Sequence, residues 1–210
     1  MKEHDIYADI SSIKNMMERS TRFISLSGLS GVMAGIYALV GAGLGYKLLY
    51  LNTDYSEYTS YRTYNKYLSV EILAIAVGVL ILSITTGLIL TIRKARRRGQ
   101  TVWNPSSRAM LVSGGLPLLT GGAFGLILLQ QGHYGVIASI CLIFYGLAVA
   151  AASQHTFSDV KWLGVCEIVL GLMAAAMPGY GLVFWALGFG VLHIIYGAVM
   201  HFKYDRENNA

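Results

Sequence analysis

Apolar residues occur along this chain in long stretches that short polar segments separate. A helix needs about 20 apolar residues to cross the hydrocarbon core of a bilayer, which is about 30 Å thick. Six stretches have this character, with approximate bounds Phe23–Leu49, Leu68–Ile92, Ala109–Leu129, Gly135–Ala152, Lys161–Met177 and Gly181–Phe202. The pattern therefore predicts an all-α polytopic membrane protein, with six transmembrane helices arranged as three hairpins.

The polar segments complete the predicted organisation. It comprises a cytoplasmic amphipathic helix, a transmembrane domain and a cytoplasmic tail, at residues 1–22, 23–203 and 204–210. The domain has an outer Tyr-rich loop at 50–67 and a cytoplasmic basic loop at 93–108. In the first segment, four residues at helical spacing form a narrow apolar stripe: Ile6, Ile10, Ile13 and Met17. Such a stripe suits packing against the bundle, the membrane surface or a partner protein.

Composition favours lipid over water as the main solvent, because 55% of the 210 residues are hydrophobic and only 13% are charged. The net charge of +5 reflects topology, since short loops rich in Lys and Arg stay in the cytoplasm. With the amino terminus inside, 13 of the 16 Lys and Arg residues are cytoplasmic, and only Lys47, Arg62 and Lys66 are outside. Both termini are therefore expected in the cytoplasm. The basic run Arg93–Arg98 adjoins a helix end, where anionic lipid headgroups explain it better than nucleic acid does.

Small residues recur every four positions in the first stretch, at Ser27, Gly31 and Gly35. This spacing favours close approach of helix backbones, which drives association where lipid offers no hydrophobic gain. In the third stretch, Pro117 lies among glycines and lacks the N–H of one helical hydrogen bond. A helix break is expected at Pro117. Broken helices form binding sites in transporters, although most such prolines only bend a helix.

Two ionisable residues stand out within the apolar stretches. Glu167 lies about two turns into the fifth stretch, and His193 lies at a comparable depth in the sixth. Antiparallel neighbouring helices bring these side chains together, so that one proton is shared between them. Tyr196, one turn beyond His193, and Tyr145 on the fourth stretch are expected neighbours. The group is either a centre that responds to protons or a lipophilic ligand, or a structural buried hydrogen bond.

Tyrosines recur at every third position in the outer loop, at Tyr55, Tyr58, Tyr61, Tyr64 and Tyr67. Tyrosine favours membrane interfaces because its ring is apolar and its hydroxyl seeks water. The pattern is typical of an aromatic belt or lid over the bundle. An aromatic surface that stacks on a planar or saccharide ligand is the alternative.

Sequence motifs for familiar chemistry are absent. The chain has no Gly-rich phosphate loop followed by Lys and Ser or Thr, no nucleophile elbow and no HExxH. No His, Cys, Asp and Glu spacing suits a metal site, and no cofactor is expected. Cys141 and Cys166 lie on separate helices, as packed free thiols do. These features favour a protein that is not an enzyme.

The last hairpin resembles a known repeat. Its spaced residues are Leu163-Gly164, Gly171-Leu172, Pro178, Leu187-Gly188 and Tyr196-Gly197-Ala198. They resemble the repeat of the HdeD-like acid-resistance membrane proteins, which are small six-helix proteins of the bacterial inner membrane. The resemblance covers roughly the last 45 residues, and the middle hairpin more loosely. It implies an envelope stress protein of the inner membrane, without an established catalytic mechanism.

The expected function is that of a stress-response or sensory module in the inner membrane. A small transporter or channel is one alternative, and a structural subunit of a membrane complex is another. The expected partners are the lipid bilayer and either a lipophilic small molecule or another membrane protein. A homo-oligomer is compatible with the pattern, and nucleic acid is not an expected partner.

Overall fold

The computed structural model describes residues 27–51, 66–97, 99 and 101–205. The main helices are α2 (Gly28–Tyr46), α3 (Lys66–Arg97), α4 (Pro105–Gln130), α5 (Ile137–Ala152), α6 (Val160–Ala176), α7 (Gly181–Trp185) and α8 (His193–Met200). Shorter π or 3-10 turns are η1 (Lys47–Leu51), η3 (Tyr134–Val136), η4 (Ser153–His155), η5 (Ala186–Leu192) and η6 (His201–Asp205). All regular elements in these ranges are helical, which confirms the all-α prediction there. The amphipathic segment 1–22 and the loop tyrosines Tyr55, Tyr58, Tyr61 and Tyr64 lie outside the described residues.

Five helical segments are long and apolar enough to cross a membrane. They are Gly28–Leu49, Val70–Arg97, Pro105–Gln130, Tyr134–His155 and Gly181–Tyr204. The stretch predicted as the fifth span forms α6, which has only 17 residues. At about 1.5 Å per residue, α6 is about 25 Å long and slightly shorter than the hydrocarbon core.

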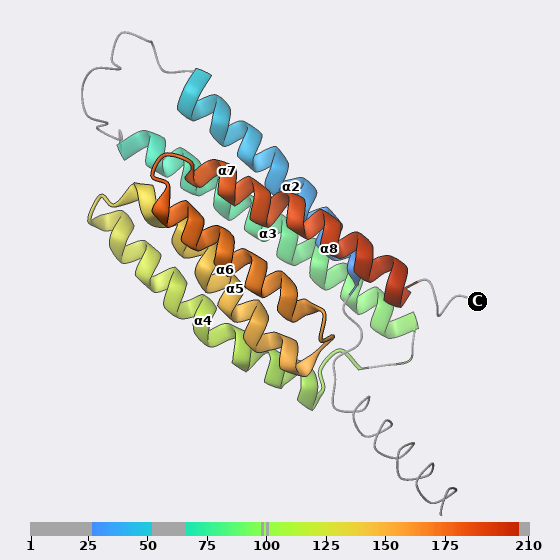
Figure 1. Cartoon of the computed structure of the whole chain (residues 1–210). Coiled ribbons are helices and arrows are strands. Elements are labelled where there is room, and N and C mark those ends of the chain that lie inside the picture. Colours follow the sequence, from blue (N-terminus) through green and yellow to red (C-terminus); the bar gives the residue numbers. More distant parts are fainter. Residues whose placement is uncertain (1–26, 52–65, 98, 100, 206–210) are drawn as a thin grey trace, which may run out of the picture.

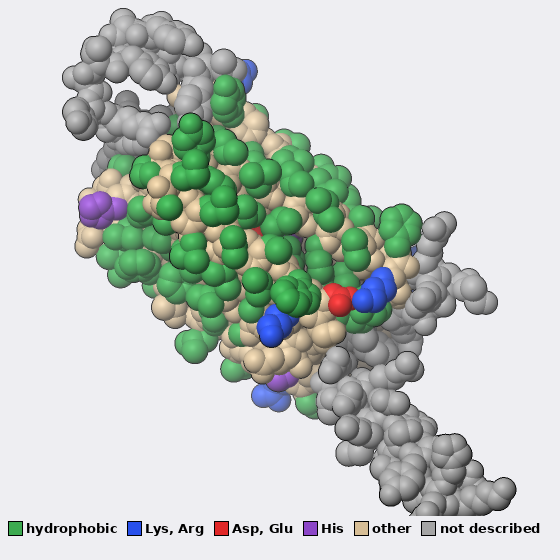
Figure 2. All heavy atoms as spheres, viewed as in Figure 1, with side chains coloured by type: hydrophobic (Ala, Val, Ile, Leu, Met, Phe, Trp, Pro, Cys, Tyr) green, Lys and Arg blue, Asp and Glu red, His purple; other side chains and the backbone are tan. Residues whose placement is uncertain are grey.

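Large apolar side chains cover the outside of these helices. Val40, Leu119 and Ile195 are 59%, 76% and 55% exposed. Figure 2 shows apolar side chains across the middle of one face of the molecule. An exposed surface of this kind is costly in water and suits the interior of a bilayer.

The helices form two layers, as Figure 1 shows. In what we call the second layer, α5 packs extensively against both α4 and α6. In the first layer, α2 packs against α3 and against the continuous run α7, η5 and α8, which we call the last helix. The last helix also contacts α5 and α6 and so joins the layers. The predicted arrangement as three hairpins is not confirmed, because α6 packs mainly against α5, although it also contacts the last helix.

Glycines set the closest helix contacts. A Cβ atom on Gly146 of α5 would lie 2.6 Å from the carbonyl oxygen of Gly164 on α6, and the reverse distance is also 2.6 Å. In the first layer, Gly31 of α2 lies against Gly197 of α8, and Gly35 lies against Gly190. The close backbone approach predicted from the spacing of small residues in the first stretch is found at Gly31 and Gly35.

The expected break at Pro117 is absent, because α4 is helical without interruption from Pro105 to Gln130. Its start is fixed by Asn104, whose side chain accepts a hydrogen bond from the Ser107 backbone N–H at 2.8 Å. The Ser107 hydroxyl oxygen accepts one from the Asn104 N–H in return, at 2.9 Å. This capping box and Pro105 at the first helical position favour the helix start. Further along, Pro117 removes only one backbone donor, and the remaining hydrogen bonds hold α4 together.

The described chain begins and ends at one end of the bundle. A Cβ atom on Gly28 would touch the backbone of His201 in η6, so the start of α2 and the end of the last helix are neighbours. We call this the Gly28 end, and the opposite one, where α7 begins, the Gly181 end. Most described Lys and Arg side chains belong to segments at the Gly28 end: Arg93, Lys94, Arg96, Arg97, Arg108, Lys161 and Lys203.

A glycine exchange tests the packing of α5 on α6. We expect Gly164→Ala to lower the apparent melting temperature in detergent, because the added carbon meets backbone atoms of α5 at 2.6 and 2.8 Å. Overpacking of this kind costs about 1–3 kcal/mol. The matched control is Gly122→Ala, since a Cβ atom there meets nothing within 4 Å. That control should leave stability unchanged or raise it by up to about 1 kcal/mol. Equal effects of the two substitutions would contradict the packing described.

Candidate functional site

A wider helical turn shapes the middle of the last helix. Residues Ala186–Leu192 form the π-type segment η5, in which Gly188 and Gly190 are buried. Such turns are rare among helices in general, but those that occur are often found at functional sites. The segment leads directly to His193, the first residue of α8.

His193 and three residues around it, Glu167, Gly188 and Tyr145, form what we call the polar centre. Glu167 on α6 is completely buried, and His193 is 6% exposed. The Glu167 Oε1 atom lies 3.3 Å from His193 Nδ1, and the Gly188 carbonyl oxygen lies 3.0 Å from the same nitrogen. On the other side of the ring, His193 Nε2 lies 2.7 Å from the Tyr145 hydroxyl oxygen on α5. The centre therefore lies between the two layers.

Hydrogen-bond chemistry assigns the protons at His193. A carbonyl oxygen only accepts, so Nδ1 carries a hydrogen and donates it to Gly188. A neutral ring then accepts the Tyr145 O–H at Nε2, whereas a cationic ring donates from Nε2 to the Tyr145 oxygen. Neither oxygen of Glu167 has a hydrogen-bond partner in the described structure. Its Oε1 atom lies near His193 Nδ1, which is already engaged by the Gly188 carbonyl oxygen.

The net charge of the polar centre depends on the number of protons that Glu167 and His193 hold. An ionised Glu167 beside a neutral His193 leaves one net negative charge in an apolar interior, which is expensive. Neutrality returns when one proton is added, either to the Glu167 carboxylate or to His193 Nε2. The geometry therefore gives this proton two alternative positions, in different layers of the bundle.

The space for the carboxyl group exists because position 188 has no side chain. A Cβ atom on Gly188 would lie 2.5 Å from Glu167 Oε2 and 2.5 Å from Leu142 Cδ2. Leu142 is fully buried and packs with Ala174 and Phe184. Glu167 thus lies against the Gly188 backbone, close to the Leu142 side chain, and none of its surface is exposed.

Aromatic rings surround the other side of the centre. The Phe189 ring lies 5.0 Å from the Tyr145 ring and 5.9 Å from the His193 ring, between centroids. Trp185, one turn earlier on the last helix, lies 5.3 Å from Phe189. A continuous row of rings therefore leads from Trp185 to His193, although the sequence spacing did not single out Phe189 or Trp185.

The predicted site residues are brought together only in part. Glu167, His193 and Tyr145 meet as expected. Tyr196 does not join them, because its ring packs against the cluster of Phe157, Val160 and Met200. Its buried hydroxyl has no hydrogen-bond partner among the described residues. Tyr67 lies in α3, but its side chain is outside the described atoms, and Pro117 contributes to α4 rather than to the centre.

A second polar contact joins the layers at the Gly28 end. Asp159, just before α6, accepts hydrogen bonds at Oδ2 from Lys203 Nζ at 2.5 Å and from the Tyr204 hydroxyl at 2.9 Å. The Tyr204 ring also stacks on Phe157, with centroids 4.2 Å apart. We call Asp159, Lys203 and Tyr204 the clasp. The hydrogen bond from Lys203 holds the pKa of Asp159 below its usual value, with a smaller contribution from Tyr204.

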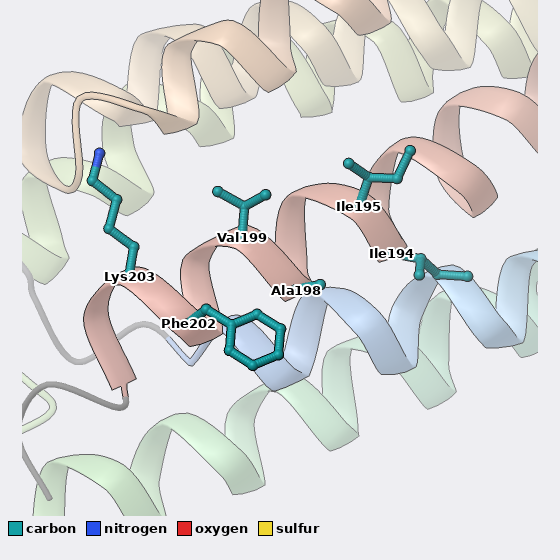
Figure 3. Close-up of a pocket in the computed structure, with 6 residues that line it drawn as sticks. All are labelled: Ile194, Ile195, Ala198, Val199, Phe202 and Lys203. Carbon is teal, nitrogen blue, oxygen red and sulfur yellow. The ribbon is translucent and has the colours of Figure 1, made fainter.

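Lys203 also ends an open groove along the last helix. Figure 3 shows Ile195, Val199 and Lys203 projecting to the same side, with Ile194 and Ala198 beside α2. Apart from the Lys203 amine, the lining side chains are apolar. The groove is part of the apolar exterior and brings no titratable group near the polar centre.

Fold and surface together indicate the class of protein, an all-helical integral membrane protein with several spans. No protein family, no curated protein and no solved structure matches this chain. Within the described residues, no three His, Cys, Asp or Glu side chains converge as a metal site requires. The functional argument therefore depends on the polar centre itself.

The clasp predicts a pH dependence of stability. Because the pKa of Asp159 is lowered in the folded protein, its contribution is present at neutral pH and is lost as the pH falls through that lowered value. We expect Lys203→Met to lower the apparent melting temperature at pH 7. The difference from the wild type should shrink as the pH falls from about 4. Lys161→Met is the control, because Lys161 is exposed and makes no contact with Asp159 among the described interactions. A Lys203→Met effect that is the same at every pH would refute this role of the clasp.

Proposed function

We propose that this protein is a proton-responsive module of the membrane, and that the polar centre is the group that responds. One observation carries the proposal: Glu167 is completely buried 3.3 Å from His193 Nδ1, and Nε2 of the same ring is hydrogen-bonded to Tyr145. A buried carboxyl group beside an imidazole binds and releases a proton according to its surroundings.

The location of the centre gives protonation a structural effect. Glu167 and Tyr145 belong to the second layer, whereas His193 and Gly188 belong to the last helix in the first. With one shared proton the centre is neutral. A second proton leaves a buried cation, and loss of the proton leaves a buried anion, so both changes weaken the contact between layers. Proton binding is thereby converted into a change in how the layers pack.

The other candidate functions have less support. Transport was expected to use a broken helix at Pro117, but α4 is continuous and contributes no residue to the polar centre. A role as a partner subunit depends on residues 1–22, which lie outside the described chain. The stress response implied by the HdeD-like resemblance is compatible with proton binding, and we include it in the proposal.

We further propose that α6 spans the membrane with the other five helices, giving six spans. Two features support this topology. α6 runs antiparallel to α5 along closely packed glycines, and both ends of the described chain lie at the Gly28 end. Because the basic residues gather at that end, we assign it to the cytoplasmic side of a bacterial inner membrane.

Histidine NMR tests the shared proton. In protein labelled with ¹⁵N-histidine, we expect Nδ1 of His193 to stay protonated while Nε2 changes with pH. Glu167→Gln should change the His193 signals and their dependence on pH, because the carboxyl group 3.3 Å from Nδ1 is then absent. The exposed His133, in the turn before α5, provides an internal control in the same spectra. If Glu167→Gln leaves the His193 signals unchanged, the two groups do not share a proton and the proposal fails.

Reporter fusions test the topology. Green fluorescent protein should fluoresce when fused after residue 99 or 210, and alkaline phosphatase should be active after residue 132 or 179. The physical reason is that each reporter works on one side of the inner membrane only. Fluorescence after residue 99 together with phosphatase activity after residue 210 would show an odd number of spans between these positions and would exclude a membrane-crossing α6.

A further inference from the structure

A cavity lies between the layers at the Gly181 end of the bundle. Its volume is about 190 Å³. The first layer contributes α2, α3 and the start of the last helix to its wall, and the second layer contributes the end of α4, η3 and α5. Among the lining residues are Gly41, Gly45, Cys141, Leu182 and Trp185.

The lining identifies the chemistry of an occupant. None of the lining residues is charged, and five of them are glycines: Gly41, Gly45, Gly135, Gly179 and Gly181. The hollow therefore exists because side chains are missing where helices of the two layers meet. An apolar cavity of about 150 Å³ in another protein stays dry and takes up benzene. A cavity of this size and lining accommodates an uncharged hydrocarbon group of one ring or a short alkyl chain.

The cavity is connected to the polar centre by direct contacts. Trp185 lines the cavity and packs on Phe189 at 5.3 Å, and Phe189 packs on Tyr145 and His193. Cys141, also in the wall, lies one helical turn before Tyr145 on α5. A molecule that displaces the Trp185 ring therefore moves the ring that packs on Tyr145 and His193.

We propose that this cavity is a binding site for a small uncharged hydrocarbon group, and that its occupancy is communicated to the polar centre through Trp185 and Phe189. The second part rests on the proposed proton-responsive function, whereas the first does not. The hydrocarbon has two sources in a membrane, the tail of a lipid or a free lipophilic molecule.

Two positions on α2 provide a matched pair of variants. A Cβ atom on Gly45 makes ordinary contacts at 3.6 and 3.9 Å with Leu182, so a larger side chain there grows into the cavity. Gly43, two residues earlier, is exposed and meets nothing within 4 Å. Gly45→Leu fills the site, whereas Gly43→Leu adds the same side chain outside it.

The binding experiment uses Trp185 as the reporter. Trp103→Phe with Trp162→Phe leaves Trp185 as the single tryptophan of the chain, and bromobenzene is the quenching probe in detergent. We expect saturable quenching in this background and with Gly43→Leu, and at least a tenfold weaker saturable component with Gly45→Leu. If quenching rises linearly with bromobenzene concentration and equally in all three proteins, it reports only partition of bromobenzene into the micelle. That result would overturn the proposed site. Circular dichroism and melting curves verify that Gly45→Leu is folded. If Gly45→Leu does not fold, a second experiment tests the site in a Cys166→Ser protein. In that protein, benzene should protect Cys141 from a thiol reagent. Absence of protection overturns the site.

Two further measurements separate the source and the coupling. The first measurement uses bilayers of phospholipids with brominated tails. If Trp185 is quenched in these bilayers and Gly45→Leu removes this quenching, the occupant is a lipid tail. Saturable bromobenzene quenching without this effect supports a free molecule. Bromobenzene should also shift the His193 ¹⁵N signals. If bromobenzene binds saturably but leaves the His193 signals unshifted, the coupling between the cavity and the polar centre is overturned and the binding site is not. The Glu167→Gln titration remains the separate test of the proton-responsive function.

Discussion

A carboxyl group enclosed by apolar atoms is costly to ionise, and the arrangement around Glu167 is understood from this constraint. Placing a charged side chain at the centre of a membrane helix costs at least about 2.5 kcal/mol. His193 relieves that cost only in the correct orientation, which the Gly188 carbonyl and the Tyr145 hydroxyl impose from opposite sides of the ring. Tyr145 and Glu167 come from α5 and α6, which lie close together at Gly146 and Gly164.

The interface between the layers contains three different kinds of contact along its length. At the Gly181 end it is hollow and apolar, in the middle it contains the polar centre, and at the Gly28 end it is closed by the clasp. The layers are therefore held by local interactions of different chemistry rather than by one continuous apolar core. The proton response that we propose for the polar centre therefore acts on an interface that already contains empty volume at one end and a polar contact at the other.

The sequence predicted what depends on local pattern. Hydropathy identified the helices, and depth along two neighbouring helices was enough to pair Glu167 with His193. The choice of helix partners was not predictable in the same way, because glycine-rich faces occur on most of the helices and the sequence does not say which ones meet. The Gly188 carbonyl was missed because a backbone acceptor leaves no mark on side-chain spacing. The predicted helix break at Pro117 was wrong because a helix tolerates one missing hydrogen-bond donor. Tyr196 was predicted beside the polar centre, but it lies one turn further along α8 and packs in the Phe157 cluster instead.

The partnership of α2 with the last helix has a consequence for biogenesis. These two helices are separated by most of the chain, yet their small-residue faces fit together at Gly31 and Gly197. A growing polypeptide enters the membrane from its amino terminus, so α2 is synthesised long before its partner exists. Of the two packing partners of α2, only α3 has been made during that interval, so the glycine face that later meets the last helix has no partner in the chain yet. The final step of assembly is therefore the return of the carboxyl-terminal segment to the first one, and a chain truncated before that segment lacks both His193 and the closure of the bundle.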